Sequence, residues 1–317
     1  MVLSVPQNRR KAVLKQKLGF LISKTFYFDF SAKALDNAYK IYETLKPMNI
    51  EGAKKERIGG EGDGGYVTII SSPPLQPRIA YSFGISTRSP WDLEIAQRGY
   101  EVFQYDGTID KPPDYHPLLK FFKFNIGSGA GQKSVRQILE ENGHTDKNII
   151  LQCDIEGSEW DVFESIDRDD ILVFEQMIIE FHNVYAAGKN FKRQLEVLKK
   201  INKTHQVVHI RGNDCGRATV LNNLLFLPES LEVTYIRKYN PATQKPENVF
   251  SECFDEFPLK DEAPNDNENI CPIYLGSFCG KRDKKVFWLF RWVLIGFLFC
   301  GYALFRVLLN DLGKNDR

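Results

Sequence analysis

Two spacings of apolar residues alternate along the middle of the chain, between residues 57 and 205. Short apolar runs with the length and composition of buried strands come at 78–86, 100–108, 116–128, 147–157 and 174–182. Between them, segments with apolar residues three or four positions apart predict helices at 90–99, 132–143, 158–166 and 190–205. This alternation predicts an α/β protein, and Gly143 is placed to end the second of these helices.

Strands that alternate with helices over short connections form parallel sheets with helices on both faces. We therefore expect a Rossmann-like, doubly wound and mostly parallel sheet. A glycine-rich turn that leads into a strand, RIGGEGDGGYVTII, precedes it at 57–70. Three further strand-like runs, at 206–213, 222–228 and 231–239, come late in the chain and could add an antiparallel edge.

Composition divides the chain into four parts. Residues 1–50 predict a helical N-terminal extension, because AKALDNAYKIYETL (32–45) places its apolar side chains on one helical face. Residues 51–240 contain the α/β domain. Residues 241–285 are rich in Pro, Asn, Asp and Glu and predict an irregular flap or linker. The very apolar segment 286–309 follows.

The segment 286–309 predicts a single C-terminal transmembrane helix. Its only charges are Arg291 and Arg306. They lie about 22 Å apart along a helix, so each arginine can reach one interface of a bilayer core about 30 Å thick. Basic residues precede the segment, and the positive-inside rule then leaves residues 1–285 in the cytoplasm on a membrane anchor. The alternative is a buried C-terminal helix of the core.

Charge and cysteine usage exclude some classes of protein. The formal net charge is +1, and no nucleic-acid-binding motif is present, so we expect no nucleic-acid partner. The six cysteines form no CxxC pair, which argues against a structural zinc site. Their scatter in a domain of this length favours a reducing compartment.

Polar residues recur where the predicted strands end. Ligands of open α/β sheets bind at the carboxyl ends of the strands, so these residues predict a site. In chain order the strand ends provide Phe83 and Gly84, then Asp106, then Asn125, then Asp154 and Glu156, and finally Glu180 and His182. The glycine-rich segment adds Asp63 and Gly64.

The first strand end indicates the type of cofactor. It has Gly84 but no G-x-G-x-x-G, which disfavours a nicotinamide dinucleotide because a pyrophosphate needs close backbone approach. Asp106 follows one strand–helix unit later, where an acid can accept hydrogen bonds from ribose hydroxyls. A solvated turn is the alternative for Asp106. S-adenosylmethionine has a ribose and no phosphate, and its positive groups suit carboxylates such as Asp63 and Asp154.

One family shares these motifs. The stretch LQCDIEGSEWDVF (151–163), followed by MIIEFH (177–182), resembles the FkbM-type S-adenosylmethionine-dependent methyltransferases. The resemblance covers about residues 55–240 and departs from the family in the short first motif FGIS and in having Asp106 where glutamate is usual. It implies O-methylation of a hydroxyl on a sugar, glycan or related small molecule. The expected cofactor-binding residues are Asp63, Gly64, Phe83, Gly84, Asp106, Asn125, Asp154 and Glu156.

Methyl transfer to a hydroxyl requires a base, and His182 is the best by residue type. Asp154 is the alternative base or orients the acceptor, and Glu180 completes the expected catalytic set. His182 could instead only complete the hydrogen bonding of a strand end. The three residues could also hold magnesium or manganese, although we favour a site without metal.

Two other functions compete with methyl transfer. A metal-dependent, membrane-associated glycosyltransferase would use the carboxylates of DIE (154–156) to hold manganese and a nucleotide sugar. A non-catalytic, tail-anchored binding protein on a degenerate methyltransferase fold would bind no cofactor.

Overall fold

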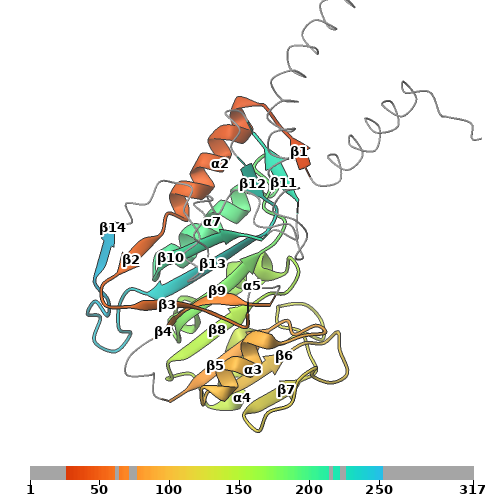
Figure 1. Ribbon diagram of the computed structural model, residues 1–317, viewed down its shortest axis with the longest axis vertical. Coiled ribbons are helices and arrows are strands. Elements are labelled where there is room, and N and C mark those ends of the chain that lie inside the picture. Colours follow the sequence, from red (N-terminus) through yellow and green to blue (C-terminus); the bar gives the residue numbers. More distant parts are fainter. Residues whose placement is uncertain (1–25, 61–63, 71–76, 214–216, 222–225, 253–317) are drawn as a thin grey trace, which may run out of the picture. The chain divides into compact units, whose positions relative to one another are not determined.

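The computed structural model describes residues 26–60, 64–70, 77–213, 217–221 and 226–252, all within one unit of the chain, Met1–Gly276 (Figure 1). A second unit, Ser277–Arg317, lies outside the described residues. At the centre is a seven-stranded sheet in the order β10-β13-β9-β8-β5-β6-β7. Its strands are β5 (Ile79–Phe83), β6 (Glu101–Tyr105), β7 (Leu119–Phe122), β8 (Ile149–Cys153), β9 (Phe174–Phe181), β10 (His205–Gly212) and β13 (Leu231–Arg237).

The sheet is mixed. The neighbours from β9 to β7 are parallel, whereas β13 runs antiparallel to both β9 and β10. We had expected an antiparallel strand at the edge, but β13 lies inside the sheet and β10 forms the edge. All seven residues of β13 are buried, which suits an interior position. The chain leaves β5 toward β7 and then resumes with β8 on the other side of β5, so the topological switch point lies between β5 and β8.

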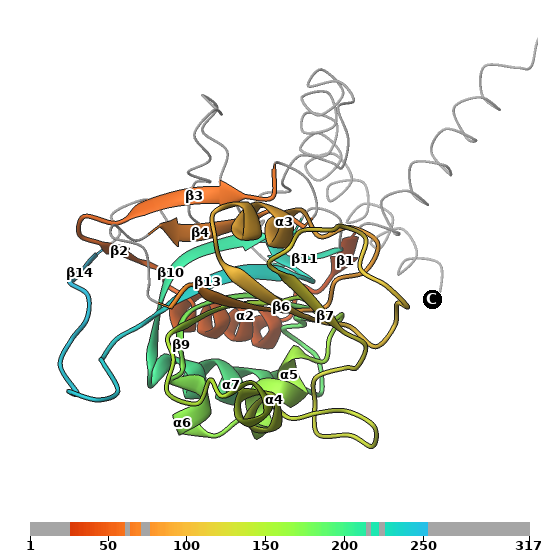
Figure 2. The ribbon, with the colours of Figure 1, turned by 90° about the horizontal axis from the view of Figure 1, so that it is seen from below.

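Helices and a hairpin cover the two faces of the sheet. The helices are α2 (Ala32–Thr44), α3 (Pro90–Gln97), α4 (Val135–Asn142), α5 (Glu159–Ser165), α6 (Arg168–Ile171) and α7 (Phe191–Asn202). In Figure 2, α3 and the hairpin of β3 (Lys54–Ile58) and β4 (Tyr66–Ile70) lie on one side of the sheet, and the other helices lie on the opposite side. Successive side chains of a strand point to opposite faces of the sheet. Both faces are covered, so the side chains on each face are buried. Thus Tyr81 and Leu151 pack with α2, α4, α5 and α7, whereas Ala80 and Ile150 pack with α3.

Local capping agrees with the predicted helix ends. Ser134 accepts a hydrogen bond from Gln137 N, and the Gln137 side chain accepts one from Ser134 N. Gly143 ends α4 in the left-handed conformation, with φ +67°, as the sequence predicted. The short helix α6 was not predicted.

The described part of the expected N-terminal extension, residues 26–50, contributes to the main core. The inner face of α2 is fully buried, and Ala34, Ala38 and Ile41 pack in the same cluster as the sheet. Asn202 of α7 donates a hydrogen bond to the Thr44 carbonyl. Residues that we expected to be helical form β1 (Phe26–Phe28) and β2 (Met48–Ile50).

Two small sheets join distant parts of the chain. Strand β1 pairs with β11 (Ala218–Val220), which in turn pairs with β12 (Phe226–Pro228). Strand β2 pairs with β14 (Phe250–Glu252), which comes from the predicted flap. Neither pairing was expected, because neither strand has a long enough pattern of its own.

The predicted architecture needs one correction. Among the described residues, no helix is long and apolar enough to cross a membrane. The segment predicted to do so, 286–309, lies outside those residues. The architecture that the structure supports is an α/β domain built on a mixed sheet, and the predicted C-terminal transmembrane helix is not among its described elements.

Candidate functional site

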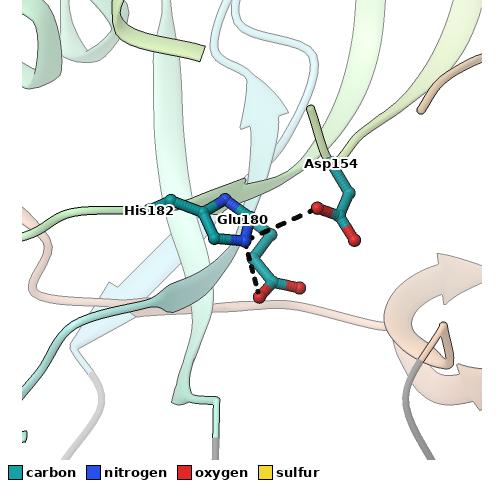
Figure 3. Close-up of side chains that lie close together, drawn as sticks. All are labelled: Asp154, Glu180 and His182. Carbon is teal, nitrogen blue, oxygen red and sulfur yellow. Dashed lines mark ion pairs between the residues drawn. The ribbon is translucent and has the colours of Figure 1, made fainter. Parts of the chain in front are cut away.

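The carboxyl ends of β8 and β9 bring together all three predicted catalytic residues. Side chains two positions apart on a strand share a face, so Asp154 continues the face of Gln152. By the same alternation Glu180 and His182 continue the face of Ile178. This face lies under α3 and the β3–β4 hairpin. Asp154, Glu180 and His182 each have one carboxylate oxygen or ring nitrogen that lies within 4.8 Å of the corresponding atoms of the other two (Figure 3).

His182 lies at the centre of the cluster. Its Nε2 is 3.4 Å from Oε1 of Glu180, 3.6 Å from Oε2 of Glu156 and 3.7 Å from Oδ1 of Asp154. Figure 3 shows the imidazole facing the Asp154 and Glu180 carboxylates. None of these contacts has the 2.7–3.2 Å length of an ordinary hydrogen bond. Glu156 differs from the other two acids because its side chain is 87% exposed.

Glu159 holds the other nitrogen of His182. Its Oε1 lies 3.1 Å from Nδ1 of His182 and accepts hydrogen bonds from the Ile155 and Gly157 backbone N–H groups. The side chain is fully buried, although Glu159 is the first residue of α5. Glu159 could have served only to start this helix, but in the structure it orients the imidazole.

A tight turn precedes α5 and Glu159. Glu156 and Gly157 both have positive φ, +55° and +104°. The φ of Gly157 is the reason why the turn needs glycine there, and a Cβ at position 157 would also lie 2.6 Å from the end of the Asn183 side chain, which would have to move.

Two residues that the sequence did not single out complete the cluster. The Tyr66 hydroxyl, at the start of β4, donates a 2.7 Å hydrogen bond to Oδ2 of Asp154. The Asn213 amide, just after β10, donates a 2.6 Å hydrogen bond to Oε1 of Glu180. Tyr66 is 88 residues from Asp154, and no spacing rule relates the two positions. Asn213 is the last position of the strand-like run that the sequence predicts at 206–213, and nothing in the sequence alone gave it a role.

Burial and crowding perturb the cluster electrostatically. Burial raises the pKa of Asp154 to about 6, against the hydrogen bond from Tyr66 and the charge of His182. Burial, followed by the charges of Asp154 and Glu232, raises the pKa of Glu180. Burial opposes protonation of His182, but the hydrogen bond to Glu159 and the charges of the surrounding acids outweigh it and raise its pKa. His182 therefore keeps a proton at neutral pH unless another cation replaces it.

We expected the Asp106 carboxylate to be free to bind a ribose, but in the structure it has hydrogen-bond partners within the protein. Its Oδ2 accepts hydrogen bonds from the backbone N–H groups of Ile85 and Ser86, both at 2.9 Å. Its Oδ1 accepts from the backbone and the hydroxyl of Thr108, at 2.7 and 2.6 Å. Burial raises the pKa of Asp106, but these hydrogen bonds outweigh it and lower the pKa overall. Both oxygens are fully used, so the carboxylate orders the loop after β5.

Gly84 lies between Asp106 and the cluster. Its φ is +84°, and a Cβ there would lie 1.7 Å from the carbonyl oxygen of Asp154. The sequence predicted that this glycine makes room for a cofactor, but it is first required by the close approach of two strand ends. Phe83, also expected at the cofactor, is fully buried in the core beside Tyr105.

Two of the remaining predicted cofactor residues are described by the structure, and the third is not. Asn125 is exposed, and its Oδ1 accepts a 2.8 Å hydrogen bond from Gly107 N, beside Asp106. Gly64 has φ +81° and packs against Pro90 at the start of α3. Asp63 lies outside the described residues.

The arrangement can bind a cation or exchange a proton. Asp154, Glu180 and His182 supply two carboxylates and one imidazole, a mixed oxygen and nitrogen set that suits manganese among other divalent metals. A comparison of the chain with protein-family models and with the sequences of curated proteins finds no match.

Proposed function

We propose that this protein is an S-adenosylmethionine-dependent O-methyltransferase that acts on a hydroxyl of a sugar, a glycan or a related small molecule. The observation that carries the proposal is the convergence of three strand ends at the topological switch point. Gly84 packs on the backbone of Asp154, and Asp106 holds the amides of Ile85 and Ser86. The switch point is where doubly wound sheets bind their ligands.

The residues at the switch point fit the cofactor in part. The exposed Asn125 and the loop Gly84–Ser86 are placed beside Asp106. Asp106 can accept a ribose hydroxyl only in exchange for one of its present partners. The Thr108 hydroxyl is the partner that a ribose hydroxyl can replace without leaving a backbone N–H unpaired. The cofactor, when bound, supplies a methyl group on a positively charged sulfur.

We assign the role of base to Asp154. A base must take the proton of the acceptor hydroxyl as its oxygen gains the methyl group, and a pKa near working pH is best for this role. Asp154 has a pKa raised to about 6, whereas His182 keeps its proton at neutral pH because acids surround it. We therefore assign His182 to stabilising the Asp154 carboxylate, in place of the base role that the sequence suggested.

Calorimetric titration of the full-length chain with S-adenosylhomocysteine tests this function. We expect micromolar binding, at least a tenfold loss when the exposed Asn125 is changed in Asn125→Ala, and unchanged binding in Glu141→Gln. Glu141 is an exposed residue of α4 that pairs with Lys133. Absence of binding by a folded wild-type protein would contradict the proposal.

One observation favours a second candidate, the metal-dependent glycosyltransferase. The cluster of Asp154, Glu180 and His182 could hold manganese that binds the diphosphate of a nucleotide sugar. This candidate predicts binding of a nucleotide sugar that requires manganese, together with no binding of S-adenosylhomocysteine.

A further inference from the structure

The cluster around His182 has an arrangement that hydrogen bonds do not explain. Nε2 faces Glu180, Glu156 and Asp154 at 3.4 to 3.7 Å. A proton on Nε2 can serve one of these carboxylates well, but it cannot serve all three. Ligands about 2.1 Å from a common metal ion lie about 3.0 to 3.5 Å from each other, on ordinary coordination angles. The distances from Nε2 to Asp154 and Glu180 are close to those of a coordination shell, and the three proposed ligand atoms lie within 4.8 Å of one another, so small side-chain movements would complete the shell.

An unpartnered oxygen atom gives an independent indication. Within the part of the chain that the structure describes, Oδ1 of Asp154 is buried and has no hydrogen-bond partner. Oδ1 is the Asp154 oxygen that faces Nε2 of His182, at 3.7 Å. Buried carboxylate oxygens without partners are costly unless a cation compensates them.

Hydrogen bonds from neighbouring residues orient the side chains of Asp154, Glu180 and His182, as they orient the ligands of metal sites. A metal-binding histidine commonly donates its second ring N–H to a carboxylate, which leaves the other nitrogen for the metal. Glu159 holds Nδ1 in this way, and its two backbone donors keep it an acceptor. Tyr66 holds the outer oxygen of Asp154, so that Oδ1 faces inward, and Asn213 fixes Glu180.

We propose that Asp154, Glu180 and His182 bind a divalent cation, Mn²⁺ or Mg²⁺, and that the cation holds an acceptor through two neighbouring oxygens. The cation site rests on the geometry above, whereas the role of the acceptor rests on the proposed methyl transfer. Three protein ligands leave about three positions of a six-coordinate ion open. A vicinal diol or a 2-hydroxy acid fills two of them, which a lone hydroxyl cannot do.

The cation changes the role assigned to Asp154. A hydroxyl bound to a divalent cation loses its proton more readily than a free one. The proton then passes to solvent by way of the exposed Glu156 carboxylate, and the oxygen forms its bond to the methyl group as the carbon–sulfur bond breaks and sulfur becomes a neutral thioether. With the cation bound, Asp154 is a ligand and Glu156 is the proton acceptor.

Titration of the full-length chain with MnCl₂, followed by the electron paramagnetic resonance signal of free Mn²⁺, tests the cation site. We expect one ion per chain, competition by Mg²⁺, and at least tenfold weaker binding in Asp154→Asn and in His182→Gln. Glu141→Gln is the matched control and should bind as the wild type does. The thermal unfolding temperature of each variant separates loss of the cation site from loss of the fold. Asparagine in Asp154→Asn has nearly the same side-chain shape as aspartate.

Calorimetry with S-adenosylhomocysteine, run in parallel on the same samples, separates the two proposals. Mn²⁺ binding without S-adenosylhomocysteine binding would support the cation site and overturn the methyltransferase. S-adenosylhomocysteine binding without Mn²⁺ binding, or Mn²⁺ binding that survives in both variants, would overturn the cation site and leave the methyltransferase in place. If both ligands bind, a vicinal diol acceptor should be methylated faster with Mn²⁺ than with a chelator, whereas equal rates would overturn the role of the cation in holding the acceptor.

Discussion

Nδ1 of His182 lies 3.1 Å from Oε1 of Glu159, a carboxylate that is itself fully buried. This contact is the largest of the influences that raise the pKa of the imidazole. It fixes which ring nitrogen faces Asp154 and Glu180, so that one buried acid controls both the orientation and the charge of His182.

Replacing Glu159 with glutamine should therefore lower the pKa of His182. The substitution keeps the shape and an acceptor for the Ile155 and Gly157 N–H groups but removes the negative charge. A histidine NMR titration of the metal-free protein measures the shift. We also expect Mn²⁺ affinity to fall by about 10- to 100-fold, the usual effect of losing such an orienting group. Asp161→Asn, an exposed position on the same helix, is the control, and an unchanged His182 pKa in Glu159→Gln would contradict the assignment.

Gly84→Ala should be strongly destabilising. The methyl group would overlap the Asp154 carbonyl oxygen, at 1.7 Å, and the backbone has φ +84°. We expect a loss of about 3 kcal/mol or more in the free energy of unfolding, measured with urea. Gly143→Ala is the matched control, because Gly143 has φ +67° and open space around it, and should cost only about 1 kcal/mol. Equal losses in the two variants would show that the close approach of the strands is unimportant.

Asp106→Ala should reduce both stability and cofactor binding. It leaves the backbone N–H groups of Ile85 and Ser86 without their acceptor, at a cost of about 1–3 kcal/mol. Thr108→Val separates the two effects, because it removes only the hydroxyl that would compete with a ribose for Oδ1. We expect Thr108→Val to bind S-adenosylhomocysteine at least as tightly as the wild type in calorimetry. Weaker binding in Thr108→Val would mean that the ribose does not replace this hydroxyl.

The stability of the protein should depend on pH through Asp92. Burial raises the pKa of Asp92 to about 7, against hydrogen bonds from Gln104 and Ser82. The folded state therefore keeps the proton to a higher pH than the unfolded chain, whose aspartates titrate near 3.9, and stability falls as pH rises from about 4 to 7. Asp92→Asn removes this loss, which amounts to about 4 kcal/mol at most. Urea unfolding at pH 5 and pH 8 should show a larger gain for the variant at pH 8, and a gain confined to pH 5 would contradict the sign.

The strands and their polar ends could be predicted because the information is local. Each buried strand of the parallel region appears in the sequence as an apolar run, and the two-residue alternation places Asp154, Glu180 and His182 on one face. Asp154 was recognised from its place after the strand, and the structure brings it to His182 as expected. The position of β13 could not be predicted in the same way, since pairing between distant strands depends on the whole sheet.

The parts of the site that were missed come from tertiary packing. Tyr66 reaches Asp154 from a hairpin that crosses the face of the sheet, and Asn213 comes from the loop after an edge strand. Glu159 occupies a position that many helices fill with an acid, so its residue type alone does not distinguish a cap from a buried partner. Asp106 illustrates the reverse case, because its residue type suggested a free ligand and the loop around it uses both oxygens.

The place of β13 also constrains how the chain is made. Strand β10 leaves the ribosome before β13, yet among the described strands of the sheet β10 pairs with β13 alone. Until residues 231–237 have emerged, β9 and β10 each present an unpaired edge to solvent or to a chaperone. Synthesis that stops before residue 237 should therefore give an aggregation-prone fragment, although β5 to β9 and the cluster residues Asp154, Glu180 and His182 are already present in it.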